Sequence, residues 1–409
     1  MMKVLHIATI DSGGAYNGAK RLNELMLANG VDSQVMVRSK THADSLTNPA
    51  FESSSQVLAS KLKNVINRLH WRRQVKRDIL GSDLRRHPLV READIIMLHW
   101  VSTFLSPKQI YQLSMLPDKK VIFVMHDMWL FTAGCHVDKR CGGYSEGCVE
   151  CPEAGRLAKS TFKKKADYIG RAHLSVTGPS HWIVNEAGKS AILKGKSISY
   201  MPNVYDPEIF YPRCLINEPE EAVSRRNKLR SKFGLSCDKK LILFGAADTG
   251  TKNSNKGFNF LLEALERIDM SDKQLVVIGN AKGADKLLEG YDAVFPGYIS
   301  DEDRLAEIYS LADVYVNPSL QESFGYTVCE AMACATPAVA FAVGGMLDQI
   351  SHKENGYLAE FCDASDLAKG IEYVLEHRDE MGSAAAKSAK RFSYEQAWES
   401  SIKPVIFGK

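Results

Sequence analysis

The sequence predicts an α/β protein built from two doubly wound domains, each with a parallel sheet covered by helices. Short apolar runs, typical of strands buried on both faces, alternate with stretches of helical pattern in both halves of the chain. The length of 409 residues also favours two domains over one. In such an architecture a ligand is held in a cleft between the two domains, which face each other.

The strands and helices of each half set the predicted domain boundaries. Residues 1–205 form the first domain and residues 206–390 the second, with the boundary near a Pro-Asn pair at 202–203. A helix at 391–409 is predicted to pack back on the first domain. The predicted strands are 3–10, 34–38, 95–99 and 121–126 in the first domain, and 241–245, 274–279 and 314–317 in the second.

Composition and charge exclude several classes of protein. The apolar fraction is 45% and the charged fraction 25%, as in ordinary globular proteins. A net charge of +3 gives no support to nucleic-acid binding. No apolar run of about 18 residues is present, so we expect no transmembrane helix. The N-terminus resembles a first strand and not a signal peptide, so we expect a cytoplasmic protein.

The segment 317–330, Asn-Pro-Ser-Leu-Gln-Glu-Ser-Phe-Gly-Tyr-Thr-Val-Cys-Glu, has the most informative functional pattern. It follows a buried strand that a proline interrupts. Gly325 lets the backbone approach a ligand and opens a helix whose first amides suit a phosphate. Glu322 precedes this turn, and Glu330 lies about a turn and a half into the helix. Phosphate-binding amides flanked by hydroxyl-binding carboxylates indicate a sugar nucleotide.

Other candidate ligand residues lie where predicted strands end. Gly13 and Gly14 follow the first strand and can let amides meet a charged group, or they form only a tight turn. His126 ends the strand 121–126 and can bond a sugar hydroxyl or the acceptor, or it is a structural histidine. Lys256 enters a helix after a strand and can neutralise a diphosphate, or it is simply exposed.

Two further observations concern the nucleotide. Gly297 and Tyr298 lie in a strand-and-turn segment that can bind a base by backbone contacts and stacking. The glycines at 13, 14 and 18 do not have the Gly-x-Gly-x-x-Gly spacing of dinucleotide-binding folds. A nicotinamide-dependent dehydrogenase is therefore disfavoured.

Four cysteines within 17 residues suggest a metal site. Cys148 and Cys151 are separated by two residues, the spacing that suits two ligands of one zinc ion, and Cys135 and Cys141 precede them. A glycine-rich loop of this kind is expected to bury little apolar surface, so a metal would order it. The predicted zinc is structural, because four thiolates leave no open position. The alternatives are four reduced thiols, or two disulfides in an exported protein.

The segment 56–80 is basic and amphipathic, with apolar residues among seven lysines and arginines. Two interpretations stay open. The segment lies on an anionic membrane face, or it is a solvated helix packed on its own domain. A second basic cluster at 163–165 is expected to lie on the surface.

In their order along the chain, these motifs resemble a known family. The spacing of Glu322 and Glu330 is similar to the E-x7-E signature of retaining GT-B glycosyltransferases of family 4, the glycosyl transferases group 1 class. The segment from His126 through Cys151 resembles a cysteine-bearing subgroup linked to bacterial polysaccharide synthesis. The other matching pairs are Gly13-Gly14, Lys256-Gly257, Gly297-Tyr298 and Gly344-Gly345.

The resemblance implies roles for individual residues of the first motifs. His126, Lys256 and Glu322 would act in catalysis: His126 would face the transferred sugar, and Lys256 would neutralise the diphosphate. Gly14 would face the donor phosphate or the acceptor. The family usually has an arginine shortly before the Lys-Gly pair; this chain has none there, and Lys252 is the candidate substitute, without the bidentate fork of an arginine.

The remaining roles concern the donor. Glu322 would hold sugar hydroxyls, while amides near Phe324 and Gly325 would contact phosphate or sugar. Glu330 would bind the ribose. Gly297 and Tyr298 complete the set of expected donor-binding residues.

The function implied by the resemblance is transfer of a sugar, with retention of configuration, from a nucleoside-diphosphate sugar to a hydroxyl of a saccharide acceptor. The acceptor would be linked to a polyprenyl lipid, in synthesis of a bacterial surface polysaccharide such as O-antigen, capsule or exopolysaccharide. The enzyme would then be cytoplasmic or peripheral on the inner face of the plasma membrane, without a catalytic cofactor. The alternatives are a sugar-nucleotide epimerase of the same fold and a zinc-organised binding protein without transferase activity.

Overall fold

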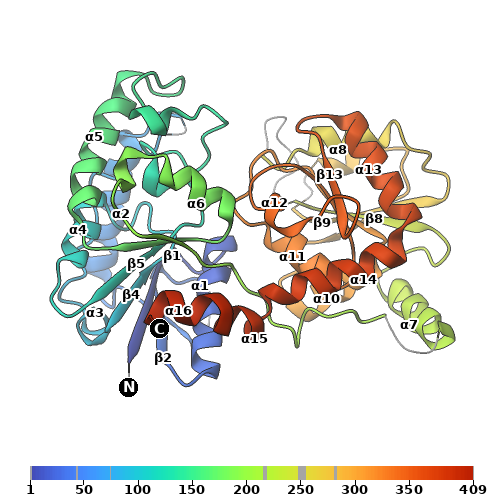
Figure 1. Ribbon diagram of the computed structural model, residues 1–409, viewed down its shortest axis with the longest axis horizontal. Coiled ribbons are helices and arrows are strands. Elements are labelled where there is room, and N and C mark those ends of the chain that lie inside the picture. The colour runs from blue at the N-terminus through green and yellow to red at the C-terminus, as the bar shows by residue number, and fades with distance from the viewer. Residues whose placement is uncertain are drawn as a thin grey trace. The chain divides into compact units, whose positions relative to one another are not determined.

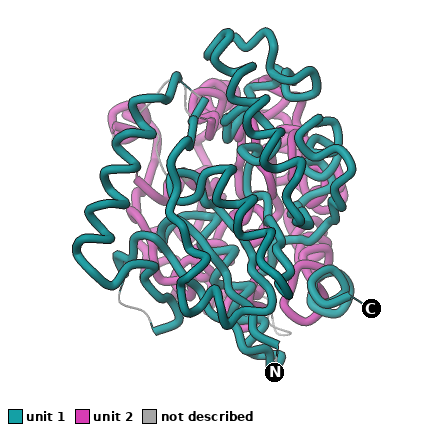
Figure 2. Tube along the Cα trace, turned by 90° about the vertical axis from the view of Figure 1, so that its left-hand side faces the viewer, with its two compact units in different colours: residues 1–204, 398–409 teal, residues 205–397 magenta. Residues whose placement is uncertain are grey.

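The computed structural model describes residues 2–42, 45–73, 75–214, 219–246, 255–280 and 283–408, and it divides into two compact units (Figures 1 and 2). Unit 1 comprises residues 1–204 and 398–409, and unit 2 comprises residues 205–397. The sequence placed this division after residue 205. Within the described ranges, no helix has the length and apolar character needed to cross a membrane.

Unit 1 contains a parallel sheet of seven strands in its described residues, in the order β3-β2-β1-β4-β5-β6-β7. The strands are β1 (Lys3–Ile10), β2 (Asp32–Ser39), β3 (Thr47–Pro49), β4 (Ile95–Leu98), β5 (Lys120–Val124), β6 (Ser175–Gly178) and β7 (Ile198–Tyr200). The helices are α1 (Gly14–Ala28), α2 (Ser54–Leu69), α3 (Pro88–Glu92), α4 (Pro107–Ser114), α5 (Arg156–Arg171) and α6 (His181–Gly188), with short 3-10 turns at Trp129–Phe131, Gly143–Glu146 and Ala191–Leu193.

Unit 2 contains a second parallel sheet, with six strands among its described residues in the order β10-β9-β8-β11-β12-β13. These are β8 (Lys240–Ala246), β9 (Lys273–Gly279), β10 (Ala293–Gly297), β11 (Val314–Asn317), β12 (Ala338–Phe341) and β13 (Gly356–Ala359). The helices are α7 (Pro219–Lys232), α8 (Phe258–Leu265), α9 (Ala284–Leu287), α10 (Glu302–Leu311), α11 (Tyr326–Ala333), α12 (Met346–Gln349), α13 (Ala364–Glu376) and α14 (Arg378–Ala389).

The strands of unit 2 are continuously apolar because both faces of the sheet are covered. Leu241 and Leu243 of β8 belong to one hydrophobic core, and Ile242 and Phe244 belong to another. Since successive side chains of a strand point to opposite faces, the two cores lie on opposite sides of the sheet. Helices α8 and α13 pack together on one of these sides, and α11 packs against α14. The prediction of doubly wound parallel sheets is confirmed.

Each sheet has one point at which the strand order reverses. It lies between β1 and β4 in unit 1, and between β8 and β11 in unit 2. In doubly wound folds the crevice for a ligand lies outside the carboxyl ends of the strands at this point. The loops that follow β1, β5, β8 and β11 carry the candidate residues named above, so their places in the two sheets suit ligand binding.

The C-terminal tail is not the single helix predicted at 391–409. It consists of a 3-10 turn (Lys390–Phe392), α15 (Tyr394–Ala397), a π-helical turn (Trp398–Ile402) and α16 (Lys403–Phe407). Ser393 has an extended backbone that interrupts the helix, and a proline opens α16. Residues 398–409 belong to unit 1, where Lys120 Nζ donates to the carbonyls of Val405 and Ile406 at 3.2 and 2.7 Å.

Candidate functional site

Two loops at the carboxyl ends of β8 and β11 meet in unit 2. Lys256 precedes α8, and its Nζ lies 2.8 Å from Oε2 of Glu322, in the loop after β11. The Lys256 side chain is 38% exposed and that of Glu322 is 21% exposed, so both can still meet a ligand. Lys252, the candidate substitute for the missing arginine, lies outside the described residues.

Backbone contacts hold the two loops in register. Asn255 donates from Nδ2 to the carbonyl of Gln321 at 2.7 Å, and its own carbonyl accepts from the amide of Leu320 at 2.8 Å. Gly257 has a φ of +68°, and an added Cβ would lie 1.9 Å from the carbonyl oxygen of Pro318. Glycine follows Lys256 because only glycine fits this close approach and this left-handed backbone.

A third loop, after β12, closes on Glu322 from another side. The amide of Gly345 donates to the carbonyl of Glu322 at 2.8 Å. An added Cβ on Gly344 would lie 1.9 Å from that same carbonyl oxygen, and one on Gly345 would lie 2.6 Å from Cα of Phe324. The two glycines therefore let the chain pack directly against the Glu322 backbone and fix its position.

The N-terminus of α11 follows the E-x7-E turn as the sequence predicted. Gly325 is the residue before α11 and has a φ of +90°. Phe324 is 3% exposed and its ring packs edge-on against Tyr326 and Phe392, so its side chain is closed to a ligand. The eight-residue α11 supplies amides at the carboxyl end of β11.

The two glutamates of the signature have different environments. Glu330 is 5% exposed on α11, and its Oε2 accepts from the Tyr309 hydroxyl at 3.4 Å, whereas Glu322 is partly exposed. Burial raises the pKa of Tyr315 on β11, and the charges of Glu330 and Glu322 raise it further. The two carboxylates of the signature thus both act on the Tyr315 phenol of β11.

Gly297 and Tyr298 lie farther along that edge. Gly297 ends β10 with a φ of +82°, and an added Cβ there would meet no heavy atom within 4 Å. Tyr298 is 80% exposed. Because β9 separates β10 from β8, these residues lie two strands away from the strand that leads to Lys256. Their proposed contact with a base stays a prediction.

In unit 1, the loop after β1 is open where the sequence predicted a charged ligand. Gly13 precedes α1 and Gly14 begins it, and in the part of the chain that the structure describes an added Cβ on either would meet no heavy atom within 4 Å. Asp11, which the sequence analysis did not single out, is buried beside them and accepts hydrogen bonds from the amides of Thr41 and His42 at 2.5 and 2.7 Å. Burial would raise the pKa of Asp11, but these hydrogen bonds hold it at about 2.

His126 is the end of a chain of three histidines that crosses the sheet. Nδ1 of His6 on β1 lies 2.9 Å from Nε2 of His99, which follows β4. Nδ1 of His99 lies 2.9 Å from Nε2 of His126, which follows β5. Burial lowers the pKa of His6 to about 3 and that of His126 to about 4, and it lowers the pKa of His99 well below its ordinary value. All three rings are neutral at pH 7.

The environment of His6 decides in which direction the hydrogen bonds of the three histidines are donated. A neutral imidazole has one N–H and one acceptor nitrogen, and Nε2 of His6 is buried without a hydrogen-bond partner among the described residues. A buried N–H without an acceptor is rarer and less favourable than a buried lone pair. We therefore place the His6 proton on Nδ1, so that each ring donates toward the next. His126 then carries its proton on Nδ1 and can donate to a ligand oxygen.

Neither His6 nor His99 was named as a site residue from the sequence. The available signal was that histidines occur in or at the ends of three apolar strands, 3–10, 95–99 and 121–126. Those strands are neighbours only in the folded sheet, where the order is β1-β4-β5.

The residues just before the cysteine loop pack into the core of unit 1, and within the loop Cys135, Tyr144 and Cys148 are buried. Trp129, Phe131 and Tyr144 are buried there. Lys165, expected on the surface, is also buried; its Nζ donates to the Trp129 carbonyl at 2.5 Å and lies 3.9 Å from the Trp129 ring centroid. Apolar packing thus contributes to the position of this part of the chain.

The four thiols of the segment differ in their exposure. Burial raises the pKa of Cys135 to about 12, with smaller contributions from the Cys151, Cys148 and Cys141 thiols. Cys135 and Cys148 are buried, Cys151 is partly buried and Cys141 is exposed. Across the described residues, no group of three or more His, Cys, Asp and Glu side chains is placed to hold a metal ion. The zinc site therefore gains no geometric support and stays a prediction.

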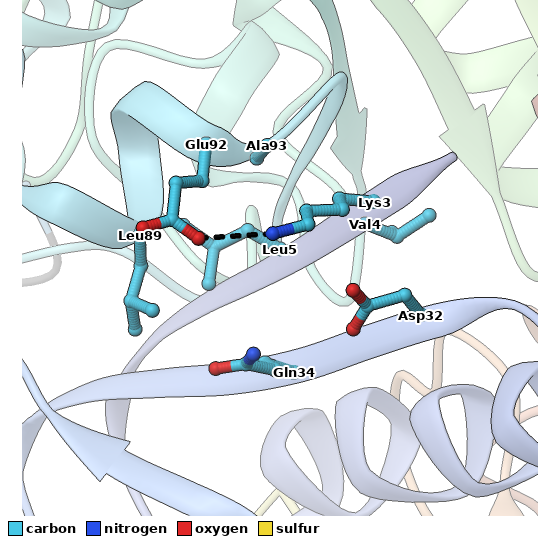
Figure 3. Close-up of a pocket in the computed structure, with 8 residues that line it drawn as sticks. All are labelled: Lys3, Val4, Leu5, Asp32, Gln34, Leu89, Glu92 and Ala93. Atoms are coloured by element: carbon cyan, nitrogen blue, oxygen red, sulfur yellow. Dashed lines mark hydrogen bonds and ion pairs between the residues drawn. The ribbon is translucent and has the colours of Figure 1, made fainter. Parts of the chain in front are cut away.

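A pocket in unit 1 lies at the amino ends of the strands, whereas the candidate ligand residues Gly14 and His126 follow the carboxyl ends. It is lined by Lys3, Asp32 and Glu92, among others, near the amino ends of β1, β2 and β4 (Figure 3). Lys3 Nζ and Glu92 Oε2 form an exposed ion pair of 3.0 Å there. The pocket thus contains none of the candidate ligand residues, and we do not assign it a part in the site.

Residues 225–393 match the family model described as glycosyl transferases group 1. This region of the chain, most of unit 2, is similar to the glycosyl transferases group 1 family. The matched residues include Lys256, Glu322 and Glu330, on which the resemblance depended. That resemblance is confirmed.

A curated relative and two solved structures extend the comparison. The D-inositol 3-phosphate glycosyltransferase of Xylanimonas cellulosilytica is 33% identical over 213 residues, which make up 49% of this chain and 49% of that protein. The alignment thus spans about half of that relative. Anabaena HepE in complex with UDP superposes with a TM-score of 0.68 at 16% identity, over 99% of both chains. WaaG, a glycosyltransferase involved in lipopolysaccharide biosynthesis, gives 0.61 at 16% identity over 99% of this chain and all of its own. These likenesses confirm the GT-B fold.

We expect Gly344→Ala to destabilise the protein. The new Cβ would collide with the Glu322 carbonyl at a backbone φ of +55°, and the combined clash and strain should lower the free energy of unfolding by about 1–3 kcal/mol. Urea denaturation measures the change. Gly170→Ala is the control, because Gly170 lies within α5 with no atom near its added Cβ. Equal stability of the two variants would contradict the close packing described for Glu322.

We expect His126 to be protonated on Nδ1 and neutral at pH 7. Long-range proton–nitrogen NMR correlations on labelled protein distinguish the two neutral tautomers and imidazolium. His6 and His99 should show the same Nδ1–H form, since one direction runs through all three rings. The proposed direction is wrong if His126 is found with its proton on Nε2.

If the zinc prediction is correct, purified protein contains about one zinc ion per chain, and Cys148→Ser removes it because a thiolate ligand is lost. Elemental analysis measures the metal. Cys237→Ser is the matched control, because Cys237 is an exposed cysteine outside the cluster. Metal-free, folded protein with four titratable thiols in the 135–151 segment would rule out the site.

Proposed function

We propose that the chain is a retaining glycosyltransferase that moves a sugar from a nucleoside-diphosphate sugar to a hydroxyl group of a saccharide acceptor. The observation that carries the proposal is the pairing of Lys256 with Glu322 at the reversal point of the unit 2 sheet. A cation and a carboxylate beside the N-terminus of α11 provide groups for the two halves of such a donor: phosphate for the cation and amides, and hydroxyls for the carboxylate.

Lys256 is proposed to stabilise the departing diphosphate. Negative charge grows on the leaving oxygen as the bond to the sugar breaks, and a fixed ammonium group and helix amides stabilise that charge. Lys256 is paired with Glu322 in the structure, but a partly exposed pair of this kind contributes only about 0–1 kcal/mol. Turning the ammonium toward a phosphate therefore costs little.

Glu322 is proposed to position the sugar and not to act as a base. In a retaining transfer the acceptor hydroxyl attacks from the side of the leaving group, and the departing phosphate can take its proton. The carboxylate, held by the Gly344-Gly345 loop, would accept hydrogen bonds from sugar hydroxyls. Glu330 is proposed to bind the ribose, and Gly14 and His126 of unit 1 to contact donor phosphate, acceptor or transferred sugar.

The acceptor is proposed to be a saccharide carried on a polyprenyl lipid at the inner face of the plasma membrane, in assembly of a bacterial surface polysaccharide. Support comes from the resemblance of the segment His126–Cys151 to a subgroup of that pathway class. WaaG, which shares the fold, is itself a glycosyltransferase of lipopolysaccharide biosynthesis. A sugar-nucleotide epimerase is the alternative, and it would change the donor without any acceptor present.

We expect Lys256→Ala and Glu322→Ala each to reduce transfer by on the order of 100-fold, the usual effect of removing one charge-stabilising or positioning contact. Transfer is measured after a panel of nucleoside diphosphates, UDP first, has been screened for a rise in melting temperature. Lys239→Ala is the matched control: Lys239 forms a comparable 3.0 Å ion pair with Asp292, at the amino end of β8.

Three results would count against the proposal. Full activity in folded Lys256→Ala or Glu322→Ala protein would contradict the roles proposed for these two residues. If no nucleoside diphosphate raises the melting temperature, the proposal that the donor is a nucleoside-diphosphate sugar is contradicted. Conversion of the donor sugar in the absence of acceptor identifies the epimerase instead.

A further inference from the structure

Helix α2 (Ser54–Leu69) presents its apolar stripe to solvent. Leu58, Leu62, Val65 and Leu69 are 69%, 60%, 54% and 70% exposed. At 3.6 residues per turn their spacing places them in one stripe about 60° wide. A surface helix normally turns such a stripe toward the protein core, so α2 has the inverse orientation.

The opposite face of α2 attaches to the protein through polar groups. Ser60 and Asn67 are buried there. Asn67 donates from Nδ2 to the carbonyl of Leu80 at 2.8 Å, and its Oδ1 accepts from the amides of Ile79 and Leu80 at 3.1 and 3.0 Å. Lys63 Nζ donates to the carbonyl of Gly81 at 3.2 Å. These bonds hold the helix, while the side chains of the apolar stripe are more than half exposed.

The surroundings of the stripe are basic. Residues 53–77 include seven lysines and arginines and no aspartate or glutamate. Lys61 and Arg68 are exposed beside the stripe, and Arg72 and Arg73 are exposed just beyond the end of the helix. Ile79 and Leu80, which Asn67 joins to α2, are 41% and 36% exposed and add apolar surface.

We propose that this face of α2, the α2 stripe with its basic edge, docks on the surface of an anionic lipid bilayer. An interfacial helix buries an apolar face in the headgroup region and places lysine and arginine beside anionic lipids. Protein partners are usually recognised by aromatic anchors that fill pockets, whereas the stripe is aliphatic and lies on a convex helix. The opposite charge of the lipids and the exposed aliphatic stripe together favour the bilayer.

This proposal deepens the proposed function, because an acceptor carried on a lipid would be met at the same surface. Binding to lipid does not itself require transferase activity. Transfer to a water-soluble acceptor, in turn, does not require the α2 stripe. The two can therefore fail independently.

The test is flotation of the full-length protein with phosphatidylcholine vesicles that contain or lack about one third phosphatidylglycerol. Two double variants probe the surface, Leu62→Ser with Val65→Ser and Lys61→Glu with Arg68→Glu. Their controls alter equally exposed residues elsewhere: Leu287→Ser with Leu347→Ser, and Lys228→Glu with Lys369→Glu. The melting temperature of each variant is measured, and since the changed side chains are exposed, it should stay near that of the parent.

The parent protein and both controls should float with the anionic vesicles and not with the neutral ones. Each α2 variant should lower the bound fraction by about tenfold or more, since two buried aliphatic side chains and two lipid-facing basic residues both contribute on that scale. The proposal is overturned if the parent protein does not float with the anionic vesicles, or if the α2 variants bind them as strongly as the parent does. It is also overturned if those variants change only the self-association of the protein, which would identify a second copy as the occupant.

Discussion

The pairing of β8 with β11 is the constraint on which the candidate donor site depends. Parallel pairing from Val314 opposite Ile242 to Val316 opposite Phe244 brings together two loops that are far apart in sequence. Lys256 and Glu322, 66 residues apart, then form a direct ion pair. The carboxyl ends of the strands are open at this point because the connections leave the sheet in opposite directions. Binding groups can therefore face a ligand without disturbing the core.

In unit 1, strand pairing likewise brings together residues that are far apart in sequence, but here the residues are histidines. The order β1-β4-β5 places three histidines side by side, and their hydrogen bonds extend from the buried middle of the sheet to its ligand-facing edge. Buried neutral imidazoles are stable only when their donors and acceptors are matched. The nitrogen of His126 that carries the proton is thus set by His6. His6 lies at the far end of the row of three hydrogen-bonded histidines, where no ligand would touch it.

Helix α2 shows a local departure from the rule that apolar faces turn inward. Polar bonds from Asn67 hold the helix, so its leucines remain available for a partner surface. The segment just before the cysteine loop follows that rule, since Trp129 and Phe131 are buried in the core of unit 1. In both segments the sequence shows which residues are apolar, but it does not show whether their side chains point toward the core or toward solvent.

The sequence by itself determined the two doubly wound sheets, because strands buried on both faces must be continuously apolar, and it located the Glu322–Glu330 turn, because proline and glycine fix local backbone geometry. Tertiary structure alone decided the contact of Lys256 with Glu322, the steric need for glycine at 257 and 344, and the histidine chain. It also decided that the tail is broken at Ser393 and that Lys165 is buried. These features arise between segments distant in sequence, where no local periodicity or propensity records which neighbour a side chain will meet.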